Sequence, residues 1–165
     1  MTRRLLALLA PLLLTGCWYY SFSGATIPSH LSSIAIPLAQ DNSVSTVTGL
    51  DQRLTELLVD RFVGQTRLSL EPQEPDADAV LNVTIASYRN QPTSVGGQER
   101  ATRNRVTVVL EVRYVDQTRG EDILTRQFSA FEEYDPLNPG QEEEAALAAL
   151  EKAADDIFTA ATSNW

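Results

Sequence analysis

The sequence contains very little of what catalytic and metal sites are usually built from. Its 165 residues include one cysteine and one histidine. A single cysteine excludes an intrachain disulfide framework and a cysteine-rich zinc site, and a single histidine excludes metal motifs that need a histidine pair. The length and the hydrophobic content of 43% are those of one ordinary globular domain. We therefore expect one folded domain that holds no metal.

The charge balance excludes another class of partner. The chain has 22 acidic and 13 basic residues, a formal net charge of −9 and a pI of about 4.5. Such a chain has no overall electrostatic attraction for phosphates of DNA or RNA, so we expect no nucleic-acid partner. The acidity is uneven, because nine acids and one base lie between Glu132 and Trp165.

The N-terminus has the pattern of an export signal. Arg3 and Arg4 form a basic start, and an apolar run follows from Leu5 to Leu14. This run is too short to span a bilayer, which needs roughly 20 apolar residues. It leads into Leu14-Thr15-Gly16-Cys17, which resembles the lipobox of bacterial lipoproteins.

The lipobox resemblance implies that residues 1–16 are a removable signal peptide and that Cys17 becomes a lipidated N-terminus. Several acyl chains on one residue anchor a protein more firmly than a single chain does. The alternative is an ordinary signal peptide that ends at a free cysteine by chance. Trp18 stands where lipoproteins retained in the inner membrane often carry Asp, which favours delivery to the outer membrane.

Hydrophobic periodicity predicts five strands and two helices in the rest of the chain. Apolar residues two apart indicate strands, and apolar residues three and four apart indicate helices. The predicted strands cover residues 34–38, 67–70, 79–88, 105–114 and 123–134, and the predicted helices cover residues 50–62 and 139–161. We interpret residues 17–33 as a lipidated tether or extended lead-in, and residues 34–165 as one domain.

Specific residues predict where the helices begin and end. Thr48 and Asp51 stand three residues apart like a capping box before the first helix, and Gly64 is well placed to end it. Asn138 and Pro139 suit the cap and the first position of the second helix.

The order of these elements is β-α-β-β-β-β-α, which predicts the α+β fold class. Each strand has one polar side, so we expect two helices packed on one face of a small mixed, mostly antiparallel sheet. The first helix forms a crossover between two strands that can be parallel. Turns join the remaining strands, which should be antiparallel.

No set of residues forms a catalytic constellation. His30 lies in the lead-in with no base or nucleophile near it in the sequence, so we interpret it as a surface or tether residue. The adjacent acids Glu142 to Glu144 point in different directions on a helix and cannot converge on a metal ion. We interpret them as a solvated first turn that the helix dipole favours. We predict that the protein is not an enzyme and uses no cofactor.

One group of arginines could serve a ligand. Arg100, Arg103 and Arg105 lie with Arg89 around the ends of two strands that we expect to form a hairpin. Guanidinium groups bind phosphate or carboxylate oxygens in a bidentate way, which allows an anion or partner contact. Arginines on the outer face of a strand more often keep an exposed sheet soluble and pair with acids, so a solvated face is the first interpretation and the anion or partner contact is its alternative.

The order and spacing of several segments resemble one known family. The segments are the lipobox, the lead-in Tyr20–Ala25, the strand Ile34–Leu38, the stretch Leu54–Leu70 and the closing residues 156–165. Together they resemble LptE, the lipopolysaccharide-assembly lipoprotein, in its Bacteroidetes-type branch. The resemblance covers nearly all of the chain after the signal, and it implies a noncatalytic lipoprotein on the periplasmic face of the outer membrane.

The resemblance also implies partners. LptE plugs the β-barrel protein LptD, helps it assemble and helps it transport lipopolysaccharide to the outer leaflet. Family members bind lipopolysaccharide through basic residues near one end of the sheet, and the nearest counterparts by location are Arg89, Arg100, Arg103 and Arg105. The alternative function is a freestanding envelope lipoprotein that binds a lipid or other amphiphile.

Overall fold

The structure is a computed structural model that describes residues 26–95, 101–138 and 140–163. Its elements are β1 (Ser33–Ala35), β2 (Gln40–Asp41), α2 (Leu50–Gly64), β3 (Ser69–Leu70), the short 3-10 helix η2 (Glu74–Asp76), β4 (Ala79–Val95), β5 (Ala101–Asp116), β6 (Glu121–Tyr134) and α3 (Gln141–Thr162). The predicted signal peptide, Cys17 and Arg100 lie outside the described residues. The described part has the predicted α+β architecture.

The sheet is mixed, and its long strands are antiparallel. The strand order is β3-β1-β4-β5-β6, with the short β2 also paired to β4. β1 is parallel to both β3 and β4, so α2 is a crossover between parallel strands as the sequence predicts. β4, β5 and β6 form an antiparallel meander of long strands.

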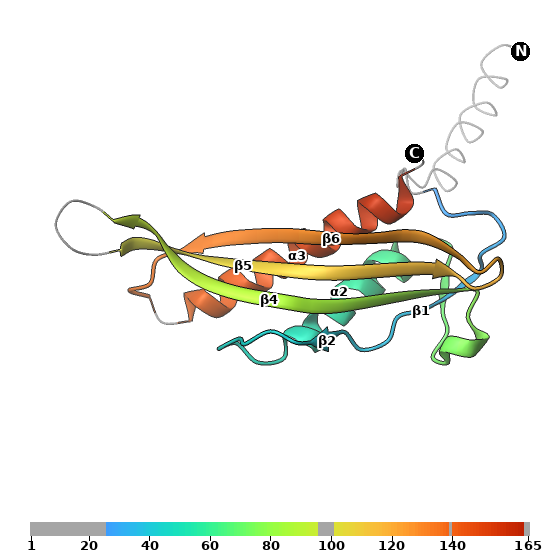
Figure 1. Ribbon diagram of the computed structural model, residues 1–165, viewed down its shortest axis with the longest axis horizontal. Coiled ribbons are helices and arrows are strands. Elements are labelled where there is room, and N and C mark those ends of the chain that lie inside the picture. The colour runs from blue at the N-terminus through green and yellow to red at the C-terminus, as the bar shows by residue number, and fades with distance from the viewer. Residues whose placement is uncertain (1–25, 96–100, 139, 164–165) are drawn as a thin grey trace, which may run out of the picture.

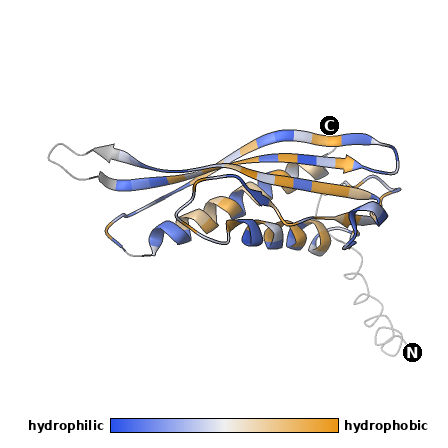
Figure 2. Cartoon of the chain, turned by 60° about the horizontal axis from the view of Figure 1, so that its bottom comes forward, coloured by the Kyte–Doolittle hydropathy of each residue, from blue (hydrophilic) through white to orange (hydrophobic). Residues whose placement is uncertain are grey.

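Both helices lie on the same face of the sheet (Figures 1 and 2). α3 crosses behind β5 and β6, and α2 lies beside α3 (Figure 1). The other face, which we call the open face, is not covered by either helix. Along β5 the buried Val106, Val108 and Leu110 alternate with Arg105, Thr107 and Glu111, so these last three side chains lie on the open face.

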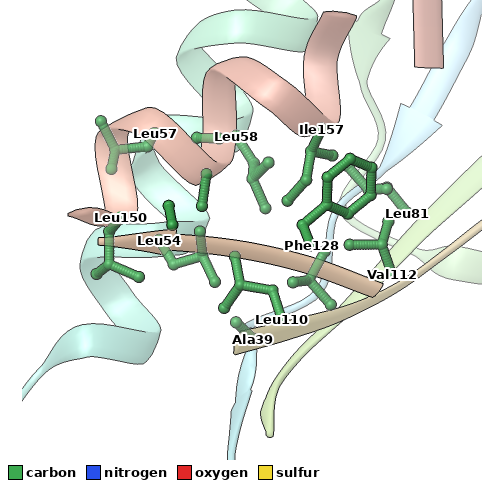
Figure 3. Close-up of a cluster of buried hydrophobic side chains, with 14 of the residues drawn as sticks. Ala39, Leu54, Leu57, Leu58, Leu81, Leu110, Val112, Phe128, Leu150 and Ile157 are labelled. Atoms are coloured by element: carbon green, nitrogen blue, oxygen red, sulfur yellow. The ribbon is translucent and has the colours of Figure 1, made fainter. Parts of the chain in front are cut away.

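The core fills the space between the helices and the sheet (Figure 3). Leu54, Leu57 and Leu58 of α2 meet Leu150 and Ile157 of α3 over the strands. Buried alanines follow the inner side of α3 at positions 145, 146, 149, 153, 154, 160 and 161. Because methyl side chains need little space, this side of α3 can lie close to the sheet and to α2.

Both helices begin later than the capping patterns predict. α2 begins at Leu50 after Gly49, and α3 begins at Gln141 after Gly140, with no side-chain cap bond at either start. The predicted caps by Thr48 and Asn138 are therefore wrong. Each glycine has a positive φ, 76° at Gly49 and 87° at Gly140, and only a residue without a Cβ adopts that conformation readily.

The bounds of all five predicted strands differ from those in the structure, and two of these differences have a clear physical cause. The first strand ends at Ala35, because Pro37 has no N–H to donate, and the chain meets β4 again as β2. β4 extends to Val95 rather than ending at Tyr88, because its polar end stays paired with β5 through register shifts near Pro92. Exposed polar strand residues look like a loop in the sequence, since they carry no apolar alternation.

The end of the lead-in is packed into the domain. Ile27 and Leu31 belong to the core, with exposed fractions of 7% and 0%. The Arg67 guanidinium donates hydrogen bonds to the carbonyls of Ile27, Pro28 and Leu31. Thr26 N–H donates to the Thr162 carbonyl at 2.8 Å, which ties the lead-in to the end of α3.

A histidine–carboxylate pair joins the lead-in to the turn between β5 and β6. His30 Nε2 lies 2.5 Å from Asp116 Oδ2, and Asp116 is 3% exposed. Thr118 Oγ1 and the Arg119 N–H donate to the other oxygen of the same carboxylate. His30 is thus half-buried and paired, which corrects its interpretation as a surface or tether residue. We call the lead-in from residue 26, residues 116–120 at the turn between β5 and β6, and the end of α3 the base.

Candidate functional site

The hairpin of β4 and β5 extends beyond both helices at the end opposite the base (Figure 1). We call its described part, residues 89–95 and 101–107, the tip. The register pairs Arg89 with Thr107, and Gln91 with Arg105. Directly opposed residues share a face, so these side chains lie on the open face of the sheet.

A bulge in β4 decides which face Arg89 occupies. Val83 and Ile85 are buried under the helices, and regular alternation would place Arg89 on that same side. The register shifts by one residue between Ile85 and Ser87, so Tyr88 faces the helices and Arg89 faces outward. The extra residue therefore keeps a charged side chain out of the covered face.

The tip arginines differ in how strongly they are already paired. Arg105 Nη2 donates to Glu133 Oε1 at 2.6 Å, and its guanidinium lies 4.3 Å from the centre of the Phe131 ring. The Arg103 side chain is 64% exposed, and its Nη1 lies 4.0 Å from Glu133 Oε2. Arg89 is exposed. Arg103 and Arg89 can therefore meet an anion without first breaking a close ion pair.

A cluster of hydrogen-bonded polar side chains lies on the helix-covered face of the sheet, next to the tip. Glu142 Oε1 accepts hydrogen bonds from Thr46 Oγ1 at 2.6 Å and from Tyr88 OH at 2.9 Å. Asn90 Nδ2 donates to Tyr134 OH at 2.6 Å, and Asn104 Nδ2 donates to Asn90 Oδ1 at 3.2 Å. These six side chains come from α3, the 42–49 loop, β4, β5 and β6, so the cluster joins the tip to the body. We call it the Glu142 cluster.

The hydrogen bonds of the cluster change the pKa values of its members. The bond from Thr46 lowers the pKa of Glu142 more than partial burial raises it, and the bond from Tyr88 lowers it further. Burial, with the bond to Glu142, raises the pKa of Tyr88. Glu142 is therefore a half-buried anion, which corrects its interpretation as a solvated residue, whereas Glu143 and Glu144 are exposed.

The sequence alone did not indicate the Glu142 cluster. Tyr88 and Asn90 stand two apart on a strand, which is a signal for a shared face, but Glu142 is more than 50 residues away. The sequence did predict that Arg89, Arg103 and Arg105 lie near one another, and the structure brings them onto one face.

The described surface carries grooves that are open to solvent. One of about 490 Å³ lies on the open face between Thr84, Arg113 and Thr125, and one of about 500 Å³ lies between Leu38 and α2. In residues 26–95, 101–138 and 140–163, no three His, Cys, Asp or Glu residues are grouped so that they could hold a metal ion. No helix within those ranges is both long enough and apolar enough to cross a bilayer.

Comparison with known proteins gives a family match and several structural matches. The family model LptE, described as lipopolysaccharide-assembly, matches residues 31–161. The structure is similar to the solution structure of uncharacterized lipoprotein B from Nitrosomonas europaea, with a TM-score of 0.57 and 12% identity over 81% of this chain and 82% of that one. None of the curated proteins compared with the chain matches it.

Two further solved structures share the fold at low identity. The hypothetical protein CT253 from Chlamydia trachomatis has a TM-score of 0.54 and 10% identity, over 81% of this chain and 99% of that one. A PelC dodecamer from Paraburkholderia phytofirmans has a TM-score of 0.50 and 11% identity, over 85% of this chain and 95% of that one. At such identities the likeness concerns the fold alone.

Proposed function

The chain belongs to the LptE lipopolysaccharide-assembly family, and from this premise we propose that it is a lipid-anchored subunit that plugs and helps assemble an LptD-like outer-membrane β-barrel. The observation that carries the proposal is the family match, which covers the domain from the lead-in to the last turn of α3. In this role the protein needs no chemistry of its own. It contributes surfaces, and its partner contributes the path for lipopolysaccharide.

The packing of the domain supports a role in surface docking. The space between the helices and the sheet is filled by side chains such as Leu54, Leu110 and Phe128 (Figure 3). A freestanding carrier of a lipid or other amphiphile needs an enclosed apolar volume, and the grooves described above are open to solvent. A broad polar sheet face with a protruding hairpin suits contact with another protein better.

The anchor in this proposal is Cys17, on the periplasmic face of the outer membrane. The mature chain would begin there, nine residues before Thr26, the first residue that the structure describes. Replacing Cys17 with Ala should move the protein from the membrane fraction to the soluble periplasmic fraction. A variant that stays in the outer membrane without the cysteine would contradict lipid anchoring.

The tip arginines are the proposed contact for lipopolysaccharide phosphates. Arg89 and Arg103 are exposed on the open face, and Arg105 lies beside them, held by Glu133. Arg100 belongs to the same proposal from its place in the sequence. Guanidinium forks match the oxygens of phosphate groups, and the net acidity of the chain does not prevent such a local contact.

The decisive experiment isolates the partner. The tagged full-length chain is purified from detergent-solubilised outer membrane, and co-purifying proteins are identified by mass spectrometry. The proposal expects an outer-membrane β-barrel in equal amount, and it expects that depletion of the chain leaves this barrel misassembled. A normally assembled barrel and unchanged surface lipopolysaccharide after depletion would reject it. Extractable lipid in a monomeric domain would instead support the amphiphile carrier.

A further inference from the structure

The outer edge of β6 has no strand beside it in the described part of the chain. β6 is the last strand in the sheet order, and it pairs with β5 along its inner edge. An edge strand keeps a row of unpaired N–H and C=O groups, and such a row is a template for a strand of another chain. This edge is therefore a candidate surface for a protein partner.

One contact from α3 shows which backbone groups of β6 point to this edge. Lys152 Nζ donates to the Phe131 carbonyl at 3.4 Å, so the backbone groups of Phe131 point outward. Both backbone groups of one residue point to the same side of a strand, and alternate residues repeat the pattern. The groups of Ser129, Gln127 and Thr125 therefore point outward as well, and all three residues are exposed.

The pairing of the inner strands gives the same assignment. The Asn42 N–H donates to the Ile85 carbonyl at 3.0 Å, so the backbone groups of Ile85 point away from β5. Leu110, which is opposite Ile85, then directs its groups toward β6, where it is paired with Phe128. Phe128 is therefore bonded to β5, and the residues on either side of it present their groups outward.

Two grooves flank this stretch of the edge, one on each face of the sheet. The groove between β6 and α3 has a volume of about 360 Å³ and is lined by residues 126–129 with Asp156, Thr159 and Ala160. The groove on the open face also reaches residues 125–127. Alternate side chains of a strand point to opposite faces, so each groove can accept one set of side chains from an added strand.

The position of α3 favours a single added strand over a second copy of the domain. The C-terminal half of α3 extends past the edge of β6 (Figure 1). Two copies that paired their β6 edges antiparallel would be related by a twofold axis perpendicular to the sheet, which places both α3 helices on the same face. The two helices would then overlap beside the shared edge. An extended segment with no helix of its own meets no such obstacle.

The groove residues also define the chemistry of the segment that fits. The wall strands of a closed barrel are already paired on both sides, so a barrel partner must supply a segment outside its wall. Side chains of that segment on the α3 side would lie on Thr159 and Ala160, which favours small residues. The exposed carboxylate of Asp156 beside them favours one lysine or arginine in the segment.

We propose that the barrel partner adds an extended segment to the outer edge of β6 as a further strand. Its backbone pairs with the outward groups of Thr125, Gln127 and Ser129, and its side chains alternate between the two grooves. Lys152 marks one end of this stretch, because it already binds the Phe131 carbonyl. The inference rests on the proposed function and identifies the surface by which the chain holds its partner.

Co-purification of the barrel with edge variants tests this surface. Each tagged full-length variant is expressed beside the untagged natural chain, so that the barrel is assembled in every culture. The barrel recovered from detergent-solubilised outer membrane is measured per tagged chain. Gln127→Pro removes an outward N–H that does not pair within the sheet, and it should recover at least tenfold less barrel than the natural chain. Gln127→Ala keeps this N–H and should recover the natural amount.

A second pair of variants changes the groove and leaves β6 as it is. Thr159→Trp places a large side chain in the groove and should also recover at least tenfold less barrel. Glu144→Trp adds the same side chain at an exposed position of α3 outside the groove and should recover the natural amount. Slow hydrogen exchange of the Val108 and Leu110 amides in each purified variant shows that the domain remains folded.

Three results would overturn this inference. Equal recovery of the barrel by the natural chain, Gln127→Pro and Thr159→Trp would show that the partner binds elsewhere. Equal losses in the matched controls would show that general surface contacts hold the partner. Slow exchange of the Thr125 and Ser129 amides in the purified natural chain alone would show that the chain covers its own edge. These results leave the proposed function standing, whereas a natural chain that recovers no barrel would reject that function and this inference with it.

Discussion

The two ends of the domain use charged residues in opposite ways. At the base, Asp116 is 3% exposed and each of its carboxylate oxygens has a partner. At the tip, the Arg103 side chain is 64% exposed and has one distant acidic neighbour. The contrast shows that the buried charge at the base connects segments that are far apart in sequence, whereas the exposed charge at the tip faces solvent.

The base is stabilised chiefly by groups that fix the lead-in. Asp78 Oδ2 accepts hydrogen bonds from the N–H groups of Ser32 and Ser33 at 2.7 and 3.1 Å. The Arg67 guanidinium donates hydrogen bonds to three carbonyls of the lead-in. Backbone groups that are half-buried outside a regular ladder need such partners, because leaving them unpaired costs free energy. Side chains of the domain therefore hold the lead-in together with the backbone bonds that Thr26 and Ser32 make to Thr162 and Ser69.

The largest expected effect is the loss of the base carboxylate. Asp116→Ala should lower the free energy of unfolding by about 3 kcal/mol, because His30, Thr118 and the Arg119 N–H lose a charged acceptor. The control is Asp122→Ala, which removes an exposed pair with Arg113 and should cost less than about 0.5 kcal/mol. Urea denaturation measures both. Equal losses of unfolding free energy in the two variants would mean that the Asp116 carboxylate stabilises the fold no more than the exposed Asp122 carboxylate does.

The same carboxylate should give the base a pH dependence. Burial raises the pKa of Asp116, but the bonds from Thr118, His30 and the Arg119 N–H outweigh it and lower the pKa from 3.8 to about 2. A carboxylate with a lowered pKa stabilises the fold above its unfolded pKa, and this stabilisation is lost as the pH falls toward the folded value. Between pH 5 and pH 2 the loss should be on the order of 2 kcal/mol.

Asp116→Asn is the control for this pH dependence. The amide cannot ionise, so the variant should be less stable at pH 5 and should lose less stability on acidification than the natural chain does. The measurement is a series of urea denaturation curves from pH 5 to pH 2. Parallel losses in both proteins would assign acid unfolding to other carboxylates and would remove the special role of the base.

The sequence predicted the architecture because its causes are local. Alternation in β5 from Val106 to Tyr114 and the leucine spacing of α2 each follow from which side must be buried. The caps at Gly49 and Gly140 were missed, because Thr48 and Asn138 are residue types that commonly cap helices through their side chains. A positive φ at the neighbouring glycine leaves no such pattern in the sequence. The sequence shows a glycine, but it does not show which backbone angle that glycine adopts.

The site was only half predictable for a related reason. Arg103 and Arg105 could be assigned to the open face because they alternate with Val106 and Val108. At the other end of the domain, the His30–Asp116 contact joins residues that are 86 positions apart. The presence of one histidine in the sequence gives no sign of this contact. Contacts between distant segments depend on the packed arrangement, and no local pattern encodes that arrangement.

At the tip, the strongest effect on stability should come from the Glu142 cluster. Glu142→Gln removes the charge that accepts bonds from Thr46 and Tyr88, and it should cost about 1 kcal/mol. Glu143→Gln is the matched control, because it removes the same charge from the same helical turn at an exposed position. Both variants lose the favourable interaction with the helix dipole. The difference in their unfolding free energies therefore measures the cluster alone.

A Glu142→Gln effect no larger than that of Glu143→Gln would remove the cluster as a support of the tip. The tip would then be held by strand pairing alone, and the hairpin amides beyond Asn90 should exchange equally fast in both variants. A larger effect of Glu142→Gln should instead speed the exchange of those amides, because Tyr88 would lose its acceptor.

The smallest effect on stability, and the sharpest test of the contrast, concerns the exposed arginine. Arg103→Ala should change the unfolding free energy by less than about 0.5 kcal/mol, because its acidic neighbour is 4.0 Å away and both groups reach solvent. The same variant should weaken binding of lipopolysaccharide to the purified chain, and more so at low salt, where charge interactions are least screened.

Arg105→Ala should weaken binding less, since Glu133 and the Phe131 ring already engage that guanidinium. If Arg105→Ala has the larger effect on binding, the ligand displaces Glu133, and the tip uses paired charge as the base does. If neither variant alters affinity at any salt concentration, the arginines serve only to keep the open face solvated.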